Sequence, residues 1–224
     1  MATTRNFPAG IFLALCIVCA ALGGRPAFAA DAAAQAGAAA DPSLQAHADA
    51  VAVVEKLHAA LLDVMKNADK LGYQGRYDKL KPVISSLFDT PLICKVILSR
   101  YWDSLNSQQQ SDFIALFNKL STATYASRFD SYSGQKFQSL SVEELHKGRL
   151  LVKTELTRPD DKPVKLDYLV HQDNSKWLII SVIADGVNDL SLKRAEYAVV
   201  IRDKGYDGLL NDIKSKISNM EKGK

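Results

Sequence analysis

Apolar residues recur at every third or fourth position along the first half of the chain, which is the period of an amphipathic helix. The clearest stripe predicts a long helix over residues 47–71 that ends at Gly72. A second helix is expected over residues 77–87, where Pro82 bends it or starts it. The stripe of the first helix consists of Val54, Leu57, Leu61, Val64, Met65, Ala68 and Leu71.

Two further helices are indicated by their start signals. Thr90 followed by Pro91 is typical of an N-cap with proline at the first helical position, and it predicts a helix that continues through Tyr101. Ser107 with Gln110 three residues later has the spacing of a capping box, and it predicts a helix over residues 107–129. The first half of the chain is therefore expected to be helical.

The pattern then changes to alternating or short apolar runs separated by turn residues, which is typical of strands. The turns between them are too short for crossover helices, so the sheet is expected to be an antiparallel meander. Helices return over residues 189–202 and 207–220, separated by Gly205. This order predicts an α+β fold, with helices packed on one face of a curved four-stranded sheet. The four predicted strands are residues 137–145, 149–156, 164–170 and 176–183.

The N-terminus has the order of a cleavable secretory signal peptide. Arg5 precedes an apolar run over residues 11–22, and Ala27-Phe28-Ala29 supplies the cleavage pattern. A membrane-spanning helix needs about 20 apolar residues, so an uncleaved anchor is the weaker alternative. We expect residues 1–29 to be the signal, residues 30–46 to be a flexible Ala-rich leader, and residues 47–220 to form a single domain.

Removal of the signal changes the charge and the cysteine content. Arg5 and Arg25 leave with it, and the remaining positive and negative charges nearly balance, so the sequence does not predict a nucleic-acid partner. Cys94 becomes the single cysteine, which excludes an intramolecular disulfide. We expect it to act as a small apolar core residue.

The sequence has no nucleophile elbow, no phosphate-binding glycine loop and no cluster of residues at metal-ligand spacing. Small α+β cones include isomerases that place an Asp and a Tyr in one apolar pocket. Asp167 and Tyr168 are adjacent in a predicted strand, so their side chains should lie on opposite faces. The chain is therefore not expected to be an enzyme or to carry a cofactor or a metal.

Several segments over residues 51–217 have a characteristic order and spacing. In the first half they are residues 84–89, 98–102, 107–113, Phe117 and residues 124–126. In the second half, Trp177, Gly186 and Val187 mark a passage from strand to helix. Together these segments resemble the periplasmic lipid-binding proteins of the MlaC or toluene-tolerance type.

The resemblance implies a cone, NTF2-like in outline, whose apolar cavity takes the apolar part of a lipid. It implies a monomeric periplasmic carrier that moves lipid between the inner and outer membranes. Its implied partners are an inner-membrane ABC-type lipid transporter and an outer-membrane receptor complex, with a role in outer membrane asymmetry. Residues 188–197 look closest to the hopanoid-associated HpnM branch, so the implied lipid is a hopanoid or a phospholipid.

By alternation along the strands and by stripe along the helices, we expect thirteen residues to line the cavity. A small-cone hydrolase or isomerase acting on an apolar substrate, and an adaptor of a membrane transport complex that binds no ligand, are the alternatives. The predicted ligand-binding residues are Val96, Ile97, Tyr101, Phe113, Phe117, Leu120, Val152, Leu156, Leu166, Tyr168, Val170, Ile179 and Ile183.

Overall fold

The computed structural model describes residues 41–159 and 161–223. The predicted signal peptide, residues 1–29, and residues 30–40 of the predicted leader lie outside the described residues. Residues 42–46, which the sequence assigned to the leader, form a short helix, α1. The side chain of Asp41 caps it by accepting a hydrogen bond from the backbone N–H of Ser43.

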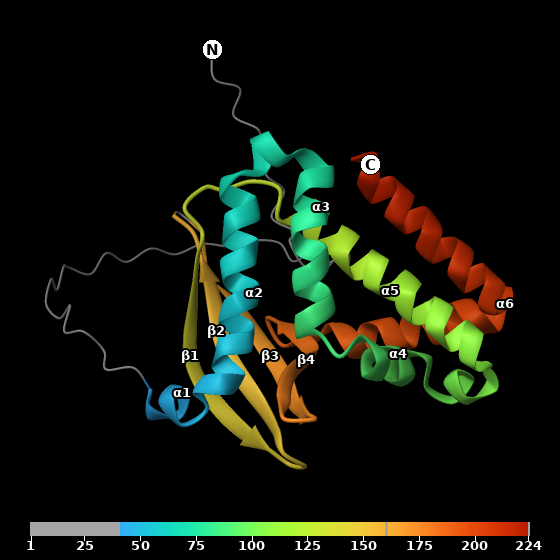
Figure 1. Ribbon diagram of the computed structural model, residues 1–224, viewed down its shortest axis with the longest axis horizontal. Coiled ribbons are helices and arrows are strands. Elements are labelled where there is room, and N and C mark those ends of the chain that lie inside the picture. The colour runs from blue at the N-terminus through green and yellow to red at the C-terminus, as the bar shows by residue number, and fades with distance from the viewer. Residues whose placement is uncertain (1–40, 160, 224) are drawn as a thin grey trace, which may run out of the picture. The chain divides into compact units, whose positions relative to one another are not determined.

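The described chain is mixed helix and antiparallel sheet, as the sequence predicts (Figure 1). A 3-10 helix, η1 (Ser99–Ser104), follows α4 where the sequence predicted that the α-helix would continue. The helices are α1 (Pro42–Ala46), α2 (Ala48–Lys66), α3 (Ala68–Leu87), α4 (Thr90–Leu98), α5 (Ser107–Arg128) and α6 (Asp189–Glu221).

The sheet follows the predicted meander, with neighbouring strands in sequence order and all pairs antiparallel. A short fifth strand, which the sequence analysis missed, extends it at one edge. Register shifts between Ser139 and Ser141 and between Leu169 and Val170 mark irregularities that bend the strands. The strands are β1 (Lys136–Leu145), β2 (Arg149–Thr157), β3 (Val164–Asp173), β4 (Lys176–Ala184) and β5 (Val187–Asn188).

Two helix caps lie one residue earlier than predicted. Asp89, not Thr90, caps α4, because its carboxylate accepts the backbone N–H of Leu92. Asn106, not Ser107, forms the capping box of α5 with Gln109. In both cases a longer side chain that carries an acceptor stands directly before the predicted cap, and it reaches the free N–H groups of the first turn.

Asp89 also joins the helices to the sheet. Its backbone N–H donates to the carbonyl of Ile179 on β4. Its carboxylate lies 2.8 Å from Nε2 of His171 near the end of β3. The start of α4 is therefore fixed against two strands.

Three backbone conformations set the directions of the helices. Gly72, with φ of 57°, interrupts α3 where the sequence predicts the end of the first helix. Gly205, with φ of 73°, bends α6 where the sequence predicts a break between two helices, and the bend is visible in Figure 1. Ser99 has φ of 52°, which L-residues rarely adopt, and it ends α4.

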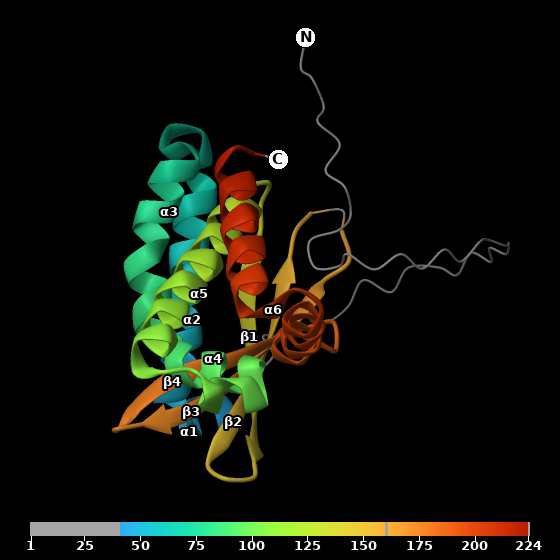
Figure 2. The same ribbon diagram turned by 90° about the vertical axis from the view of Figure 1, so that its right-hand side faces the viewer.

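The hydrophobic interior has two parts, which we treat separately. The sheet-side interior lies where α2 packs on the sheet and contacts β1, β2 and β4. The helical cluster lies among α4, η1, α5 and α6, and the views in Figures 1 and 2 place these helices beside one another. The buried residues of the helical cluster are Ile93, Cys94, Ile97, Leu98, Trp102, Phe113, Phe117, Leu120, Tyr197, Ile201, Leu209 and Ile213.

Candidate functional site

One face of the sheet is apolar and turned toward the helices. Val152 is directly opposite Tyr168 in the pairing of β2 with β3, and directly paired residues lie on the same face. The hydroxyl of Thr154 on this face is satisfied, because it donates to the carbonyl of Leu166 at 2.6 Å. Six predicted ligand-binding residues are buried in the strands of the sheet: Val152, Leu156, Leu166, Tyr168, Val170 and Ile179.

Two other predicted residues lie elsewhere. Ile183 pairs with Asp167, whereas Tyr168 pairs with Val182, so Ile183 is on the opposite face from Tyr168. The shift in register between Leu169 and Val170 moves the alternation in β4 relative to β3, and this shift has no signal in the sequence. Val96 is only partly buried on α4.

The remaining predicted residues belong to the helices. Ile97, Phe113, Phe117 and Leu120 are buried in the helical cluster, and Tyr101 is partly buried against it. This cluster contains no residue of a strand. The structure therefore brings eleven of the thirteen predicted residues into two regions and leaves Val96 and Ile183 outside them, and the role of all thirteen in ligand binding stays a prediction.

Aromatic rings form a chain of contacts that leads from the helices to the sheet. The ring of Phe88, after α3, lies 6.0 Å from Tyr125 on α5, which lies 5.8 Å from Phe129. Phe129 in turn lies 6.5 Å from Phe137 on β1. Phe137 stacks at 4.1 Å on His58 of α2. We call Phe88, Tyr125, Phe129, Phe137, His58 and Tyr168 the aromatic chain.

His58 and Tyr168 form the polar end of this chain. Nε2 of His58 lies 3.0 Å from the hydroxyl of Tyr168, and their side chains are almost fully buried. Burial lowers the pKa of His58 to about 4, because an apolar environment disfavours the charged imidazolium. The pair is therefore neutral at neutral pH, and each member satisfies a hydrogen bond of the other.

Phe88, Tyr125 and Phe137 keep some accessible surface, whereas Phe129, His58 and Tyr168 are buried. Burial raises the pKa of Tyr125, because an apolar environment disfavours the charged phenolate. Within the described part of the chain, the hydroxyl of Tyr125 has no hydrogen-bond partner. Tyr125 thus presents an unpaired polar atom in the interior.

Sequence reasoning selected only Tyr168 from the aromatic chain. Tyr125 and Phe129 are four residues apart, so they lie on one face of α5, and this spacing is the signal that was available. His58 gave no signal, because a histidine beside an apolar stripe is usually solvated, whereas here the sheet covers it.

A groove is lined by residues from the end of α4, from η1 and from the first half of α6. The helices α4 and α6 contact one another, and Figures 1 and 2 show them side by side. Its cavity volume is about 240 Å³, and it is partly open to solvent. Two residues predicted from the sequence, Ile97 and Tyr101, line it. The full lining is Ile97, Leu98, Ser99, Arg100, Tyr101, Arg194 and Ala198, which we call the Arg100–Arg194 groove.

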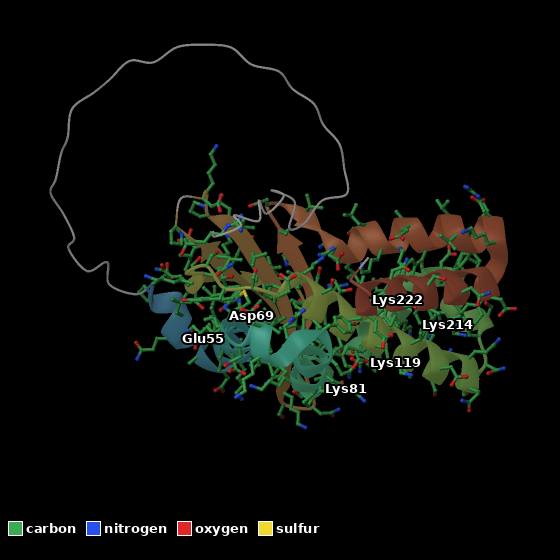
Figure 3. The ribbon with its side chains drawn as sticks, turned by 90° about the horizontal axis from the view of Figure 1, so that it is seen from above. Glu55, Asp69, Lys81, Lys119, Lys214 and Lys222 are labelled. Carbon is green, nitrogen blue, oxygen red and sulfur yellow. The ribbon has the colours of Figure 1, made fainter. Side chains whose placement is uncertain are left out.

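Lysines are exposed on the outer side of the helices. Lys119 of α5, Lys214 of α6 and Lys222, which directly follows α6, are labelled in Figure 3. Among residues 41–159 and 161–223, none of these three has a carboxylate within 4.0 Å.

The described residues contain no group of three or more His, Cys, Asp or Glu side chains that could hold a metal ion. Asp167 and Tyr168 have different partners in the register and lie on opposite faces, as the sequence predicts. Burial raises the pKa of Asp167. The side chain of Tyr168 lies on the other face of the sheet, so the two residues do not form an Asp–Tyr pair in one pocket. In the part of the chain that the structure describes, no helix is long and apolar enough to cross a membrane.

A comparison with models of protein families shows to which family the chain belongs. The family model described as "MlaC protein" matches residues 55–215, which is more than half of the chain. The chain belongs to the MlaC family. The match includes α2 from its first turns, the whole sheet and most of α6, so it takes in both parts of the interior.

A solved structure with the same fold is a phospholipid-binding protein from Ralstonia solanacearum, determined in complex with a phospholipid. The two chains are 20% identical, with a TM-score of 0.68. The alignment covers 77% of this chain and 99% of the Ralstonia chain. At 20% sequence identity, this similarity shows that the MlaC-family chain and the Ralstonia protein share a fold.

Proposed function

We propose that this MlaC-family protein binds a lipid and holds its apolar part in the sheet-side interior, beside the aromatic chain. The observation that carries the proposal is Tyr125. It belongs to the aromatic chain that ends at the buried Tyr168, through its contact with Phe129, and yet it keeps accessible surface and an unpaired hydroxyl. A space beside Tyr125 and Phe137 would be lined by apolar side chains, which is the usual character of a small-molecule site.

The comparisons support a lipid as the ligand. The chain is a member of the MlaC family, and the similar Ralstonia protein was determined with a phospholipid bound. The helix-facing side of the sheet presents buried aliphatic residues such as Val152 and Val170, which suit an acyl or polycyclic chain. The ligand is proposed to be a phospholipid or a hopanoid.

We further propose that the protein carries lipid between the inner and outer membranes. The family is periplasmic in general, and the N-terminal sequence has the order of an export signal. Burial of a chain of roughly sixteen carbons contributes about 12 kcal/mol at about 0.8 kcal/mol per CH₂. Spontaneous release would therefore be slow, and docking to a membrane transporter and a receptor would be needed to open the site.

An organic extract of the protein purified from its native periplasm tests the binding. We expect about one lipid per protein, identified by mass spectrometry. Native mass spectrometry of the same sample should show the protein with that mass added. An extract that contains no stoichiometric lipid, from folded protein, would contradict the proposal and favour an adaptor. Turnover of an apolar substrate would favour an enzyme.

A pair of tyrosine variants tests the position of the ligand. Tyr125→Asp places a charge beside the proposed site, and it should remove most of the co-purified lipid. Tyr132→Asp is the matched control, because Tyr132 is 41% exposed and stands outside the aromatic chain. Tyr125→Trp, which adds volume without charge, repeats the test if the aspartate variant does not fold. Equal lipid content in folded Tyr125 and Tyr132 variants would exclude this site.

A further inference from the structure

The Arg100–Arg194 groove has the composition of a small anion site with an apolar floor. Ile97 and Leu98 are 1% exposed, so they form a packed floor, and Ala198 closes one side without a bulky side chain. Arg100 and Arg194 are exposed and stand at the same opening from η1 and α6. A cavity of about 240 Å³ is smaller than the roughly 300–1,000 Å³ of sites for drug-sized molecules, so it suits a headgroup better than a whole lipid.

The two arginines of the groove are not neutralised. Across residues 41–159 and 161–223, neither guanidinium has a carboxylate oxygen within 4.0 Å. By contrast, Arg202, one turn beyond the groove on α6, is paired with Asp203. The groove therefore carries two positive charges that no carboxylate of the described residues neutralises.

The side chains of the groove are held in place by contacts among themselves. Arg194 donates from a terminal nitrogen to the hydroxyl oxygen of Ser99 at 3.0 Å. The guanidinium of Arg100 lies 5.2 Å from the ring centre of Tyr101 and donates to its hydroxyl at 3.4 Å. Both contacts leave other N–H groups of each guanidinium free, because a guanidinium carries five donors.

Ser99 adds an independent observation. Its φ of 52° is unfavourable for a residue with a side chain, and such strain persists only where the surrounding structure fixes it. The strained backbone turns the chain from α4 into η1, and thereby places Arg100 beside the floor made by Ile97 and Leu98. The hydroxyl of Ser99 also orients Arg194.

We propose that the Arg100–Arg194 groove binds the phosphate of a lipid headgroup, with the adjoining apolar part of the molecule against Ile97, Leu98 and Ala198. Guanidinium groups recognise phosphate through paired, charge-assisted hydrogen bonds. An uncharged lipid cannot make these bonds, so the groove selects a phospholipid over a hopanoid without a phosphate. This inference rests on the proposed function, because it takes a lipid as the ligand.

The test uses the full exported protein, washed free of co-purified lipid with a mild detergent and dialysed. Calorimetric titration compares three probes: dihexanoyl phosphatidic acid, dihexanoylglycerol and inorganic phosphate. We expect the phosphatidic acid to bind at least tenfold more tightly than either of the others. Binding of inorganic phosphate as tight as that of the lipid probe would overturn the assignment to a lipid headgroup.

Charge variants locate the binding. Arg100→Gln and Arg194→Gln should each weaken binding of the phosphatidic acid about ten- to hundredfold, which is the effect of losing a charged hydrogen-bond donor. Arg149→Gln is the matched control, because Arg149 is an exposed arginine at the start of β2, outside the groove. Arg194→Lys, which keeps the charge, should recover part of the affinity, and a purely structural role for Arg194 would not predict that recovery.

The periplasmic extract separates failure of this inference from failure of the proposed function. One outcome is that the extract contains stoichiometric lipid while the glutamine variants bind phosphatidic acid as well as the wild type does. In that case the assignment of the headgroup to the groove is overturned, and the proposal that the protein binds lipid stands. If the extract contains no lipid and the short-chain probes do not bind, both proposals are overturned. Thermal melting of each variant ensures that only folded protein is compared.

Discussion

The sheet-side interior and the helical cluster are both apolar, but they differ in the exposure of some of their aromatic residues and in their buried polar pairs. In the helical cluster, Cys94 and Phe113 have no exposed surface. In the sheet-side interior, Tyr125 and Phe137 keep accessible surface, and His58 and Tyr168 bring a neutral hydrogen-bonded pair into the apolar wall. A fully buried ring stabilises a framework, whereas partly accessible apolar side chains beside a few polar atoms have the character of a ligand site.

The largest expected effect concerns the framework. Phe113→Ala should lower the free energy of unfolding by about 3–5 kcal/mol, because it removes a fully buried ring from a packed cluster. Urea denaturation measures this change. Phe137→Ala is the counterpart on β1, and its cost should be smaller because Phe137 is only partly buried.

The same pair of variants also discriminates between the two regions by function. Lipid per folded protein should be unchanged in Phe113→Ala and reduced in Phe137→Ala. The reverse order in lipid content would show that the helical cluster and not the sheet-side interior holds the ligand.

The next effect depends on pH. The pKa of His58 is lowered from 6.5 to about 4 in the folded protein, so the unfolded chain takes up the proton first as the pH falls. The stability that neutral His58 contributes is fully present above pH 6.5 and is lost as the pH falls toward 4. The loss is about 3 kcal/mol at about 1.4 kcal/mol per unit of pKa.

The variant His58→Gln isolates this contribution, because glutamine keeps hydrogen-bonding groups and does not titrate. Urea denaturation of both proteins between pH 7 and 4 should show the wild type losing more stability than the variant. Parallel curves for the two proteins would mean that His58 is not buried in its neutral form.

A smaller effect is expected from the hydroxyl groups of the sheet-side interior. Tyr168→Phe leaves the buried Nε2 of His58 without its partner, and should cost about 1–3 kcal/mol. Tyr125→Phe removes a hydroxyl that has no partner among the described residues, and should change stability by less than about 0.5 kcal/mol. Equal costs in chemical denaturation would show that the Tyr125 hydroxyl is also bonded.

The smallest expected effect concerns Cys94, whose thiol should not react while the protein is folded. Cys94 has no exposed surface, and burial raises the pKa of its thiol, so a thiol reagent should label it only as fast as the protein unfolds. The double variant Cys94→Ala with Tyr125→Cys moves the thiol to the sheet-side interior. That thiol should be labelled faster than unfolding, and competition by bound lipid should slow it. Rapid labelling of native Cys94 would contradict the tight packing of the helical cluster.

Much of the fold could be predicted because local signals were strong. The four long strands lie within a few residues of the predicted ranges, since alternation and turn residues both indicate them. Gly72 and Gly205 were identified as breaks because a positive φ is easiest for glycine. Ser99 could not be identified in this way, because a serine has no intrinsic preference for its conformation, and α4 was therefore predicted to continue into η1.

The candidate site was less predictable than the fold. Apolar periodicity identified residues that become buried, because ten of the thirteen chosen residues are buried and only Val96, Tyr101 and Ile183 are partly buried. It failed at Ile183, which changes face because of a register shift. Apolar periodicity cannot distinguish the lining of a ligand cavity from a packed core, because both consist of the same apolar side chains. Phe113 and Tyr168 thus look alike in sequence and lie in different regions.

The sequence by itself determined the order of helices and strands, the antiparallel meander and membership of the MlaC family, because each depends on local periodicity or on the spacing of residues along the chain. Tertiary structure alone decided that His58 meets Tyr168 across 110 positions of sequence, and that Arg100 and Arg194 open onto one groove. Burial, pairing and uncompensated charge depend on which distant segments come together, and that information is set by packing.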